Sequence, residues 1–407
     1  MSGNSTSKLI GSALIIVGTC IGAGMLVLPL VTAAIGFTLS ILLLIFVAFL
    51  MLATALLIVE VNLHFPEGTH FGRMSEQTLG LVGKAVTWVS FLLLLYALTA
   101  AYTSQASTLL SLWLGDIGVN LPTWGNGLLY ILVLGSFVYM GTGAVDGLNK
   151  FLISIKGLVF FALAVVLSPH ISTHDLFRST TNINYIWYAF PLLITAFGYH
   201  VVLPSLRTYL NSDPKALRRA VVVGALTPLV IYLIWEVVTL GTIPLHGEHS
   251  FKFIANHGGS ATELVETYQA RFHSDWIETF AAIFTNVAVL TSFLGVSLSL
   301  FSFNQDSFGL NKNKAKHKVP VYFLTYLPPF IFAVCYPDGF VMALGYASIF
   351  VAILLIILPA MMAWKVRSEK GRNSNRSKAY LILIMLLGVG FIVLQFMSDA
   401  GKLPVFH

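Results

Sequence analysis

Three glycines interrupt an apolar run near the amino terminus. Gly18, Gly22 and Gly24 lie within residues 12–29, a run that is otherwise suited to a membrane helix. Glycine readily leaves helical geometry, and a break leaves main-chain N–H and C=O groups without partners. A bilayer tolerates such groups only where they line a cavity or are buried in protein. The run therefore predicts a broken helix that binds a ligand with main-chain atoms, which is more typical of a transporter than of an enzyme.

A second interruption lies around Gly198, within residues 193–204. At about 1.5 Å per residue, Gly18 lies roughly 15 Å from Lys8 and Gly198 roughly 14 Å from Arg207, so both breaks fall near the centre of a ~30 Å hydrocarbon core. The two runs cross the membrane in opposite directions, five spans apart, as an inverted repeat predicts. In the alternative interpretation, these glycines only allow neighbouring helices to pack closely.

The elements that must position these breaks are membrane helices. Of the 407 residues, 57% are hydrophobic and 10% are charged, whereas soluble domains carry about 25% charged residues. This composition predicts an all-α integral membrane protein. Eleven stretches are long enough to cross a bilayer, namely residues 8–35, 37–63, 84–114, 122–141, 149–168, 183–206, 217–243, 275–303, 319–336, 339–364 and 379–398. The first span continues directly into the second, so we expect no cleavable signal peptide.

Lysine and arginine residues set the expected orientation, because cytoplasmic loops carry an excess of them. With a cytoplasmic amino terminus, the inner side receives Lys8, Arg73, Lys84, Lys150, Arg207, Lys215, Arg218, Arg219, Lys312, Lys314, Lys316, Lys318, Lys365, Arg367, Lys370, Arg372, Arg376 and Lys378. The outer side keeps Arg178, Lys252, Arg271 and Lys402. We therefore expect a carboxy terminus on the outer side. The net charge of +6 then reflects membrane orientation, and no nucleic-acid partner is needed to explain it.

Catalytic motifs are absent from the sequence. It contains no His-Glu-x-x-His zinc motif, no Gly-x-Ser-x-Gly elbow and no pair of facing aspartates at the membrane midplane. Cys20 and Cys335 both fall in predicted spans, so they indicate no disulfide framework. The longest hydrophilic stretch, residues 244–274, is an expected outer loop with a short amphipathic segment around residues 261–272. We expect no enzyme, no metal site and no cofactor, and we expect the function to lie among the helices.

The two breaks also carry a family resemblance. Residues 18–29 and 196–206 resemble the hydroxy and aromatic amino acid permease family, especially its bacterial tyrosine- and tryptophan-specific members, and residues 60–62 and 291–295 extend the resemblance over essentially the whole chain. The resemblance implies an eleven-span carrier of the bacterial inner membrane with the leucine-transporter fold, driven by the proton gradient. Its implied units are a first inverted repeat at residues 1–168, a second at 183–364, and an eleventh span with a tail at 379–407.

An amino acid substrate would bring a carboxylate and an ammonium group to the breaks. The helix dipole of the outer half of span one favours a carboxylate, which free N–H groups would bind. These N–H groups belong to Ile21, Gly22, Ala23 and Gly24. Carbonyls opened by the breaks would receive the ammonium, and they belong to Gly18, Thr19, Ala196 and Phe197, next to Gly198. For the Thr19 side chain the alternative is a bond to a carbonyl of its own helix.

An aromatic ring would need an apolar pocket. Phe197 is positioned to close over it, and Tyr96 and Tyr102 face the middle of the bundle if span three begins near Lys84. The alternative for each of these aromatic residues is simple packing. Asn286, in the middle of span eight, is expected either to contact substrate or to bond a neighbouring helix.

Lys156 is the main candidate for the proton-coupling group. It lies about 9 Å beyond Lys150 along span five, where a buried ammonium can exchange a proton. In proton-driven relatives of this fold a span-five lysine takes the place of sodium, whereas Thr291 and Ser292 resemble hydroxyls that bind sodium in sodium-driven relatives. We favour the lysine, because an ammonium excludes a cation from the same space. The alternative is that Lys156 extends toward the headgroups.

Two other intramembrane polar residues are weaker coupling candidates. Glu236 in span seven is either an outer-gate or proton-relay group or an interfacial carboxylate. His200, after the second break, is either a hydrogen-bonded core histidine or a proton-linked gate.

These features together favour a proton symporter for an aromatic amino acid, tyrosine before tryptophan. The alternatives are a sodium-coupled neutral amino acid symporter and, from another class, a channel or sensor. Sodium dependence of uptake distinguishes the proton symporter from the sodium symporter. Uptake against a gradient distinguishes either symporter from a channel or sensor.

Overall fold

The protein is built from helices joined by short loops. The structure is a computed structural model that describes residues 3–177, 183–307, 315–404 and 406, and no strand occurs among them. Its helices are α1 (Gly3–Cys20), α2 (Gly24–Thr32), η1 (Ala33–Ile35), α3 (Phe37–Asn62), α4 (Phe71–Asp116), α5 (Thr123–Met140), α6 (Thr142–Leu167), η2 (Ser168–His170), α7 (Thr173–Leu176), α8 (Tyr185–Thr195), η3 (His200–Val202), α9 (Leu203–Tyr209), α10 (Pro214–Thr242), α11 (Phe251–Asn256), α12 (Ala261–Phe272), α13 (Asp275–Ser307), α14 (Ala315–Cys335), α15 (Phe340–Val351), η4 (Ala352–Ile357), α16 (Leu358–Glu369) and α17 (Asn375–Asp399).

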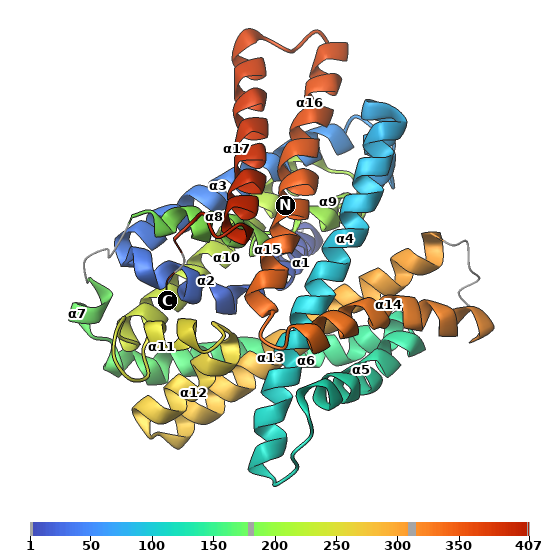
Figure 1. Ribbon diagram of the computed structural model, residues 1–407. Helices are drawn as coiled ribbons and strands as arrows, with labels where there is room; N and C mark the ends of the chain where they lie inside the picture. The colour runs from blue at the N-terminus through green and yellow to red at the C-terminus, as the bar shows by residue number, and fades with distance from the viewer. Residues whose placement is uncertain (1–2, 178–182, 308–314, 405, 407) are drawn as a thin grey trace.

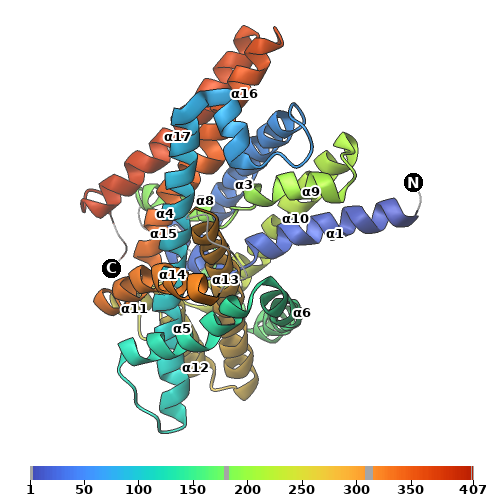
Figure 2. The ribbon, with the colours of Figure 1, turned by 90° about the vertical axis from the view of Figure 1, so that its right-hand side faces the viewer.

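The expected number of spans is confirmed. Within the described residues, ten helices are long and apolar enough to cross a membrane, and α1 with α2 forms an eleventh span bent by 57°. The bend falls at residues 21–23, inside the glycine-interrupted run. In Figure 2, α1 extends to the amino terminus at one edge of the molecule while the carboxy terminus lies at the opposite edge. Of the basic residues behind the expected topology, Arg178, Lys312 and Lys314 lie outside the described residues.

The sixth span is also broken, as predicted. Helix α8 ends at Thr195, and regular α-helix resumes only at α9, after the short helical turn η3. The Ala196 and Phe197 N–H groups donate hydrogen bonds to the carbonyls three residues earlier, at 3.2 and 3.3 Å, as in a 3-10 turn. Pro204 lies in the first turn of α9, where a residue without an N–H group costs nothing. The span therefore consists of two half-helices that meet near Gly198.

The third span begins earlier than expected. Helix α4 starts at Phe71 rather than near Lys84 and continues to Asp116. Gly80 has φ of 73°, which bends the chain within this helix, so a short first segment precedes the membrane-crossing part. Figure 1 shows α4 running most of the height of the molecule, beside the projecting hairpin of α16 and α17. Helix α4 contacts α5, α13, α14 and α15, and it forms one wall of the central bundle.

The loop between α10 and α13, which is expected on the outer side, contains the predicted amphipathic segment as α12 (Ala261–Phe272). Its first turn carries a capping box in which Ser260 and Glu263 satisfy each other's main-chain N–H groups. Burial raises the pKa of the Glu263 carboxyl above its usual value, although hydrogen bonds from Ser260 oppose the shift. Gln105 of α4 then accepts a hydrogen bond from the Ala261 N–H at 3.0 Å and donates one to Thr262 at 2.8 Å. The loop is thereby tied to the bundle.

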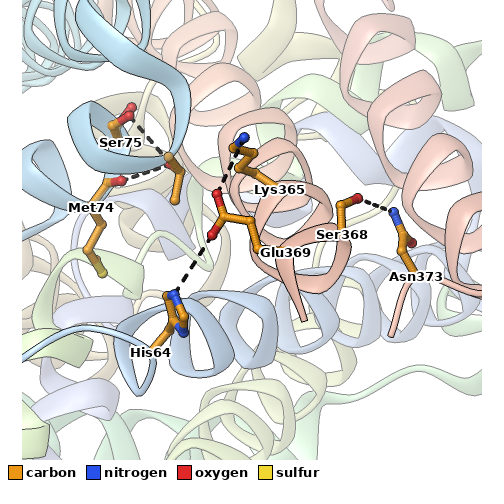
Figure 3. Close-up of polar contacts among 8 residues, drawn as sticks. His64, Met74, Ser75, Lys365, Ser368, Glu369 and Asn373 are labelled. Atoms are coloured by element: carbon orange, nitrogen blue, oxygen red, sulfur yellow. Dashed lines mark hydrogen bonds and ion pairs between the residues drawn. The ribbon is translucent and has the colours of Figure 1, made fainter. Parts of the chain in front are cut away.

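At the end of the bundle away from α12, polar contacts join the ends of spans two (α3), six (α8 and α9) and ten (α15 and α16). Glu60 of α3 accepts two hydrogen bonds from Arg367 of α16, at 2.9 and 2.6 Å. Arg207 of α9 donates to the Asn62 and Phe65 carbonyls at 2.5 and 2.9 Å. Close by, Glu369 lies between His64 and Lys365 (Figure 3). Spans two, six and ten are therefore joined at this end.

Candidate functional site

A cavity of about 650 Å³ lies where the two broken spans meet. Its size falls within the range of small-molecule sites, which is about 300–1,000 Å³. It is lined by these predicted residues: Gly18, Thr19, Ile21, Gly22, Gly24, Tyr102, Lys156, Ala196, Gly198, Thr291 and Ser292. Apolar side chains of α4 form a further wall, made by Phe91, Leu94, Leu95 and Leu98. The arrangement provides main-chain polar groups on one side and an apolar surface on the other.

Three of the four N–H groups expected to be free in the first break already have partners. The Ile21 N–H donates to the Val17 carbonyl at 2.9 Å, and the Gly22 N–H donates to the Cys20 carbonyl at 2.9 Å. The Ala23 N–H donates to Ser292 Oγ at 2.8 Å, so a side chain of α13 caps the start of α2. Of these four, only the Gly24 N–H has no acceptor among the described residues. The expectation of four free donors is wrong for this geometry because the break forms tight local bonds.

The carbonyls of the breaks divide into occupied and open groups. The Ala196 carbonyl accepts the Tyr232 hydroxyl at 2.8 Å, and the Phe197 carbonyl accepts the Tyr199 N–H at 3.0 Å. The Gly18 and Thr19 carbonyls receive no donor from the described residues, and both residues line the cavity. The Thr19 hydroxyl donates to the Ile15 carbonyl of its own helix at 2.8 Å, so the alternative interpretation holds for this side chain. The open acceptors for an ammonium are therefore the Gly18 and Thr19 carbonyls.

Tyr232 of α10 joins the two breaks and was not predicted. Its hydroxyl lies 2.7 Å from the Cys20 carbonyl and 2.8 Å from the Ala196 carbonyl, and the residue is 0% exposed. The hydroxyl has one hydrogen, so it donates to one carbonyl at a time. The only signal in the sequence is its place one helical turn before Glu236, on the same helix face.

Four predicted substrate contacts do not line the cavity. Phe197 is fully buried, and its ring packs edge-on against Tyr232 at 5.1 Å, so it does not close over the cavity in this conformation. Tyr96 points toward α14 and donates to the Leu324 carbonyl at 2.9 Å. Asn286 donates to the Ala282 carbonyl on its own helix at 2.9 Å. Ala23 is also absent from the lining, because it is buried under Ser292.

Lys156 reaches the first break and is 4% exposed. Its Nζ donates to the Ile21 carbonyl at 2.5 Å and to Thr291 Oγ1 at 3.0 Å. Its side chain therefore turns inward, and the interpretation that it extends toward the headgroups is wrong. Within the part of the chain that the structure describes, no carboxylate forms an ion pair with it. The ammonium links α6, the break and α13.

The two hydroxyls of span eight support the same break. Thr291 donates its hydrogen to Ala288 at 3.1 Å and accepts from Lys156. Ser292 donates to Ala288 at 2.8 Å and accepts the Ala23 N–H. Both oxygens are therefore engaged by donors of this chain.

Glu236 and His200 lie outside the cavity lining, and both are 0% exposed. Glu236 contacts Thr32 Oγ1 at 3.0 and 3.1 Å, so the interpretation as an interfacial carboxylate is wrong. His200 Nε2 pairs with Thr54 Oγ1 at 2.8 Å, and its Nδ1 has no hydrogen-bond partner. His200 is thus a core histidine with one nitrogen satisfied.

Replacing Tyr232 by phenylalanine should impair the transport that the family resemblance implies, while leaving the fold in place. The change removes the one hydrogen that the Cys20 and Ala196 carbonyls share. An unpaired buried acceptor costs about 1–3 kcal/mol, and 1.4 kcal/mol corresponds to about tenfold in an equilibrium. We expect uptake into vesicles of the labelled aromatic amino acid that the family resemblance implies to fall about tenfold or more at equal protein content.

The matched control for this change is Tyr130→Phe. The Tyr130 hydroxyl is also buried, but it has no hydrogen-bond partner in the described structure. This variant should transport like the parent protein. Equal uptake by Tyr232→Phe and Tyr130→Phe would show that the bridge between the breaks is not needed.

Comparison with known proteins agrees with this architecture. The sequence model of the tryptophan/tyrosine permease family matches residues 5–395. The tryptophan-specific transport protein of Shigella flexneri is 33% identical over 99% of this chain and 98% of its own length. Tyrosine-specific transport system 1 of Haemophilus influenzae is 33% identical over 98% and 99%, and the low affinity tryptophan permease of Escherichia coli K12 is 31% identical over 97% and 96%.

A solved structure shares the fold at much lower sequence identity. The crystal structure of MhsT in complex with L-phenylalanine aligns with a TM-score of 0.61 and 14% identity, covering 96% of this chain and 98% of that one. The fold is therefore of the leucine-transporter type, as predicted. The chain belongs to the tryptophan/tyrosine permease family and is a multi-pass membrane transport protein, not an enzyme.

Proposed function

We propose that the protein imports an aromatic amino acid, tyrosine or tryptophan, together with a proton. The relatives named above transport these two amino acids. In the cavity, the Gly18 and Thr19 carbonyls would receive the substrate ammonium. The Gly24 N–H, at the positive end of α2, would bind the carboxylate. The ring would lie against Tyr102 and the apolar wall of α4.

The observation that carries proton coupling is the position of Lys156. Its ammonium occupies the space between the Ile21 carbonyl and Thr291, where a bound cation would otherwise find oxygen ligands. Loss of its proton would weaken its attraction for the Ile21 carbonyl and loosen the break from α6 and α13.

Glu236 is a second candidate carrier, because its fully buried carboxyl contacts Thr32 at the end of α2, the outer half of the first broken span. The Thr32 hydroxyl has one hydrogen, which it donates either to the Glu236 carboxyl or to the Leu28 carbonyl, 2.8 Å away.

Transport would follow alternating access in the cytoplasmic membrane of a bacterium. One set of packed elements contains α1, α2, α3, α8 and α10, and another contains α4, α5, α6 and α13. Lys156 and Ser292 connect the sets at the first break. The cavity extends along Ile15 of α1 to Asp146 and Lys150 of α6, toward the side of the amino terminus. With that terminus in the cytoplasm and the carboxy terminus outside, this conformation would face inward.

The test is uptake of labelled tyrosine and tryptophan by proteoliposomes under an imposed proton gradient, with and without sodium and with a protonophore. We expect accumulation that needs no sodium and is abolished by the protonophore. A requirement for sodium would contradict proton coupling and favour the sodium symporter. Failure to accumulate either amino acid would contradict the proposed substrate and favour a different ligand or a sensor.

A further inference from the structure

A small basic pocket of about 170 Å³ lies apart from the transport cavity. It is lined by Arg218, Arg367, Lys370 and Arg372, with Glu60 and two apolar residues. These residues belong to the end of α3, the start of α10, the end of α16 and the turn that follows α16. Two segments distant in the sequence therefore bring four cations to one pocket, and a third brings Glu60.

Most of this positive charge has no counter-ion. Glu60 pairs with Arg367, which leaves three of the four cations uncompensated. Arg218, Lys370 and Arg372 form no ion pair with the described residues. Neighbouring carboxylates have other partners. Glu369 contacts His64 and Lys365 (Figure 3), and Asp213 caps the first turn of α10. Because like charges that share a pocket repel, an anion bound there would be stabilised.

The pocket lies at the depth where the hydrocarbon core ends. The candidate spans that surround it end at Asn62, begin at Pro214 and end at Glu369. Lipid phosphates occupy this level of a bilayer, and basic pockets between membrane helices bind anionic headgroups. Guanidinium groups bind phosphate oxygens with two parallel hydrogen bonds, which suits a pocket with three arginines.

We propose that this pocket binds a phosphate group, supplied in the membrane by the headgroup of an anionic phospholipid. An excess of three positive charges favours an anionic headgroup over a zwitterionic one, whose amine the pocket would repel. A bound headgroup would hold the ends of α3 and α10 against α16. This site is independent of the substrate and coupling proposed above.

The experiment measures thermal unfolding of the purified full-length protein in detergent. The probes are phosphatidylglycerol, phosphatidylcholine with the same acyl chains, and inorganic phosphate. A ligand that binds only the folded state raises the unfolding temperature by an amount that grows with the logarithm of its concentration relative to its dissociation constant. We expect phosphatidylglycerol to raise it and phosphatidylcholine to leave it nearly unchanged. An equal rise with inorganic phosphate would support the phosphate site and identify free phosphate as the source.

Paired variants locate the effect. Arg218→Gln with Arg372→Gln should raise about tenfold the phosphatidylglycerol concentration that gives the same shift in unfolding temperature, because equal shifts occur at equal ratios of ligand concentration to dissociation constant. The control, Arg73→Gln with Arg376→Gln, removes the same charge from exposed positions outside the pocket. It should respond like the parent protein. The proposal is overturned if both double variants respond alike, or if both lipids stabilise the parent equally.

Discussion

We expect replacement of Lys156 by methionine to abolish accumulation of substrate, while substrate binding persists. Methionine has a similar length but carries no proton and donates no hydrogen bond to the Ile21 carbonyl. A proton moving across about 100 mV supplies about 2.3 kcal/mol, enough for about 50-fold accumulation if one proton accompanies each substrate. In the variant we expect an accumulation ratio of about one at that gradient, since the driving force is uncoupled. Uptake in proteoliposomes and equilibrium binding of labelled tyrosine or tryptophan measure the two quantities separately.

Two further variants separate proton coupling from structural support. Lys156→Gln keeps a donor for the Ile21 carbonyl but carries no charge, so it should bind substrate and still fail to accumulate it. Lys150→Met removes an exposed lysine of the same helix that also lines the cavity, and it should accumulate substrate normally. Full accumulation by Lys156→Gln would remove Lys156 from proton coupling. Failure of Lys150→Met as well would mean that any cation of α6 near the cavity is required.

The membrane fold could be predicted from the sequence because its main determinant is local. An apolar run of about 20 residues is long enough to cross the bilayer wherever it occurs, and eleven such runs gave the right number of spans. Both breaks were also predictable, because glycine and proline act on the backbone at their own positions. The boundary of span three was wrong because helix α4 already begins at Phe71, and its first segment is joined to the rest at Gly80.

The side-chain partners were harder to predict because they depend on helix rotation. A membrane helix is apolar around its whole circumference, so hydropathy does not indicate which face points inward. Tyr96 and Tyr102 illustrate the error. At about 100° per residue they lie about 120° apart around α4, so they were unsuited to sharing one cavity. Tyr102 lines the cavity, whereas Tyr96 faces α14.

Long-range contacts explain what the sequence did not indicate about the site. Tyr232 lies 212 residues from Cys20 in the chain, and Ser292 lies 269 residues from Ala23. Nothing local predicts that these hydroxyls occupy main-chain groups of the breaks. Lys156 was predictable because a lysine within a membrane span demands a buried partner. The partner that it finds is a carbonyl freed by the same break that the glycines predict.

Substitution of Gly22 has the other large expected effect. The sequence attributes this effect to loss of an N–H group that binds the substrate carboxylate, whereas the structure attributes it to close packing against Ser292. The Gly22 N–H already bonds to Cys20, so it does not bind the carboxylate in this conformation. A Cβ atom at this position would instead overlap Ser292 Oγ, the group that caps Ala23. Alanine should displace α13 from the break, and leucine should also fill the cavity. We expect Gly22→Leu to abolish measurable binding and Gly22→Ala to weaken it about tenfold, which corresponds to about 1.4 kcal/mol.

The control for Gly22 must separate close approach from the loss of a glycine. Gly157 of α6 is exposed on the bundle surface, and an added Cβ there meets nothing within 4 Å. Gly157→Ala should therefore bind and transport like the parent protein. If Gly22→Ala weakens binding, then Gly22→Ala combined with Ser292→Ala should restore part of it, because the smaller side chain relieves the overlap. Unchanged affinity in Gly22→Leu would contradict the placement of substrate at the first break, since the leucine side chain and the substrate would compete for the same space.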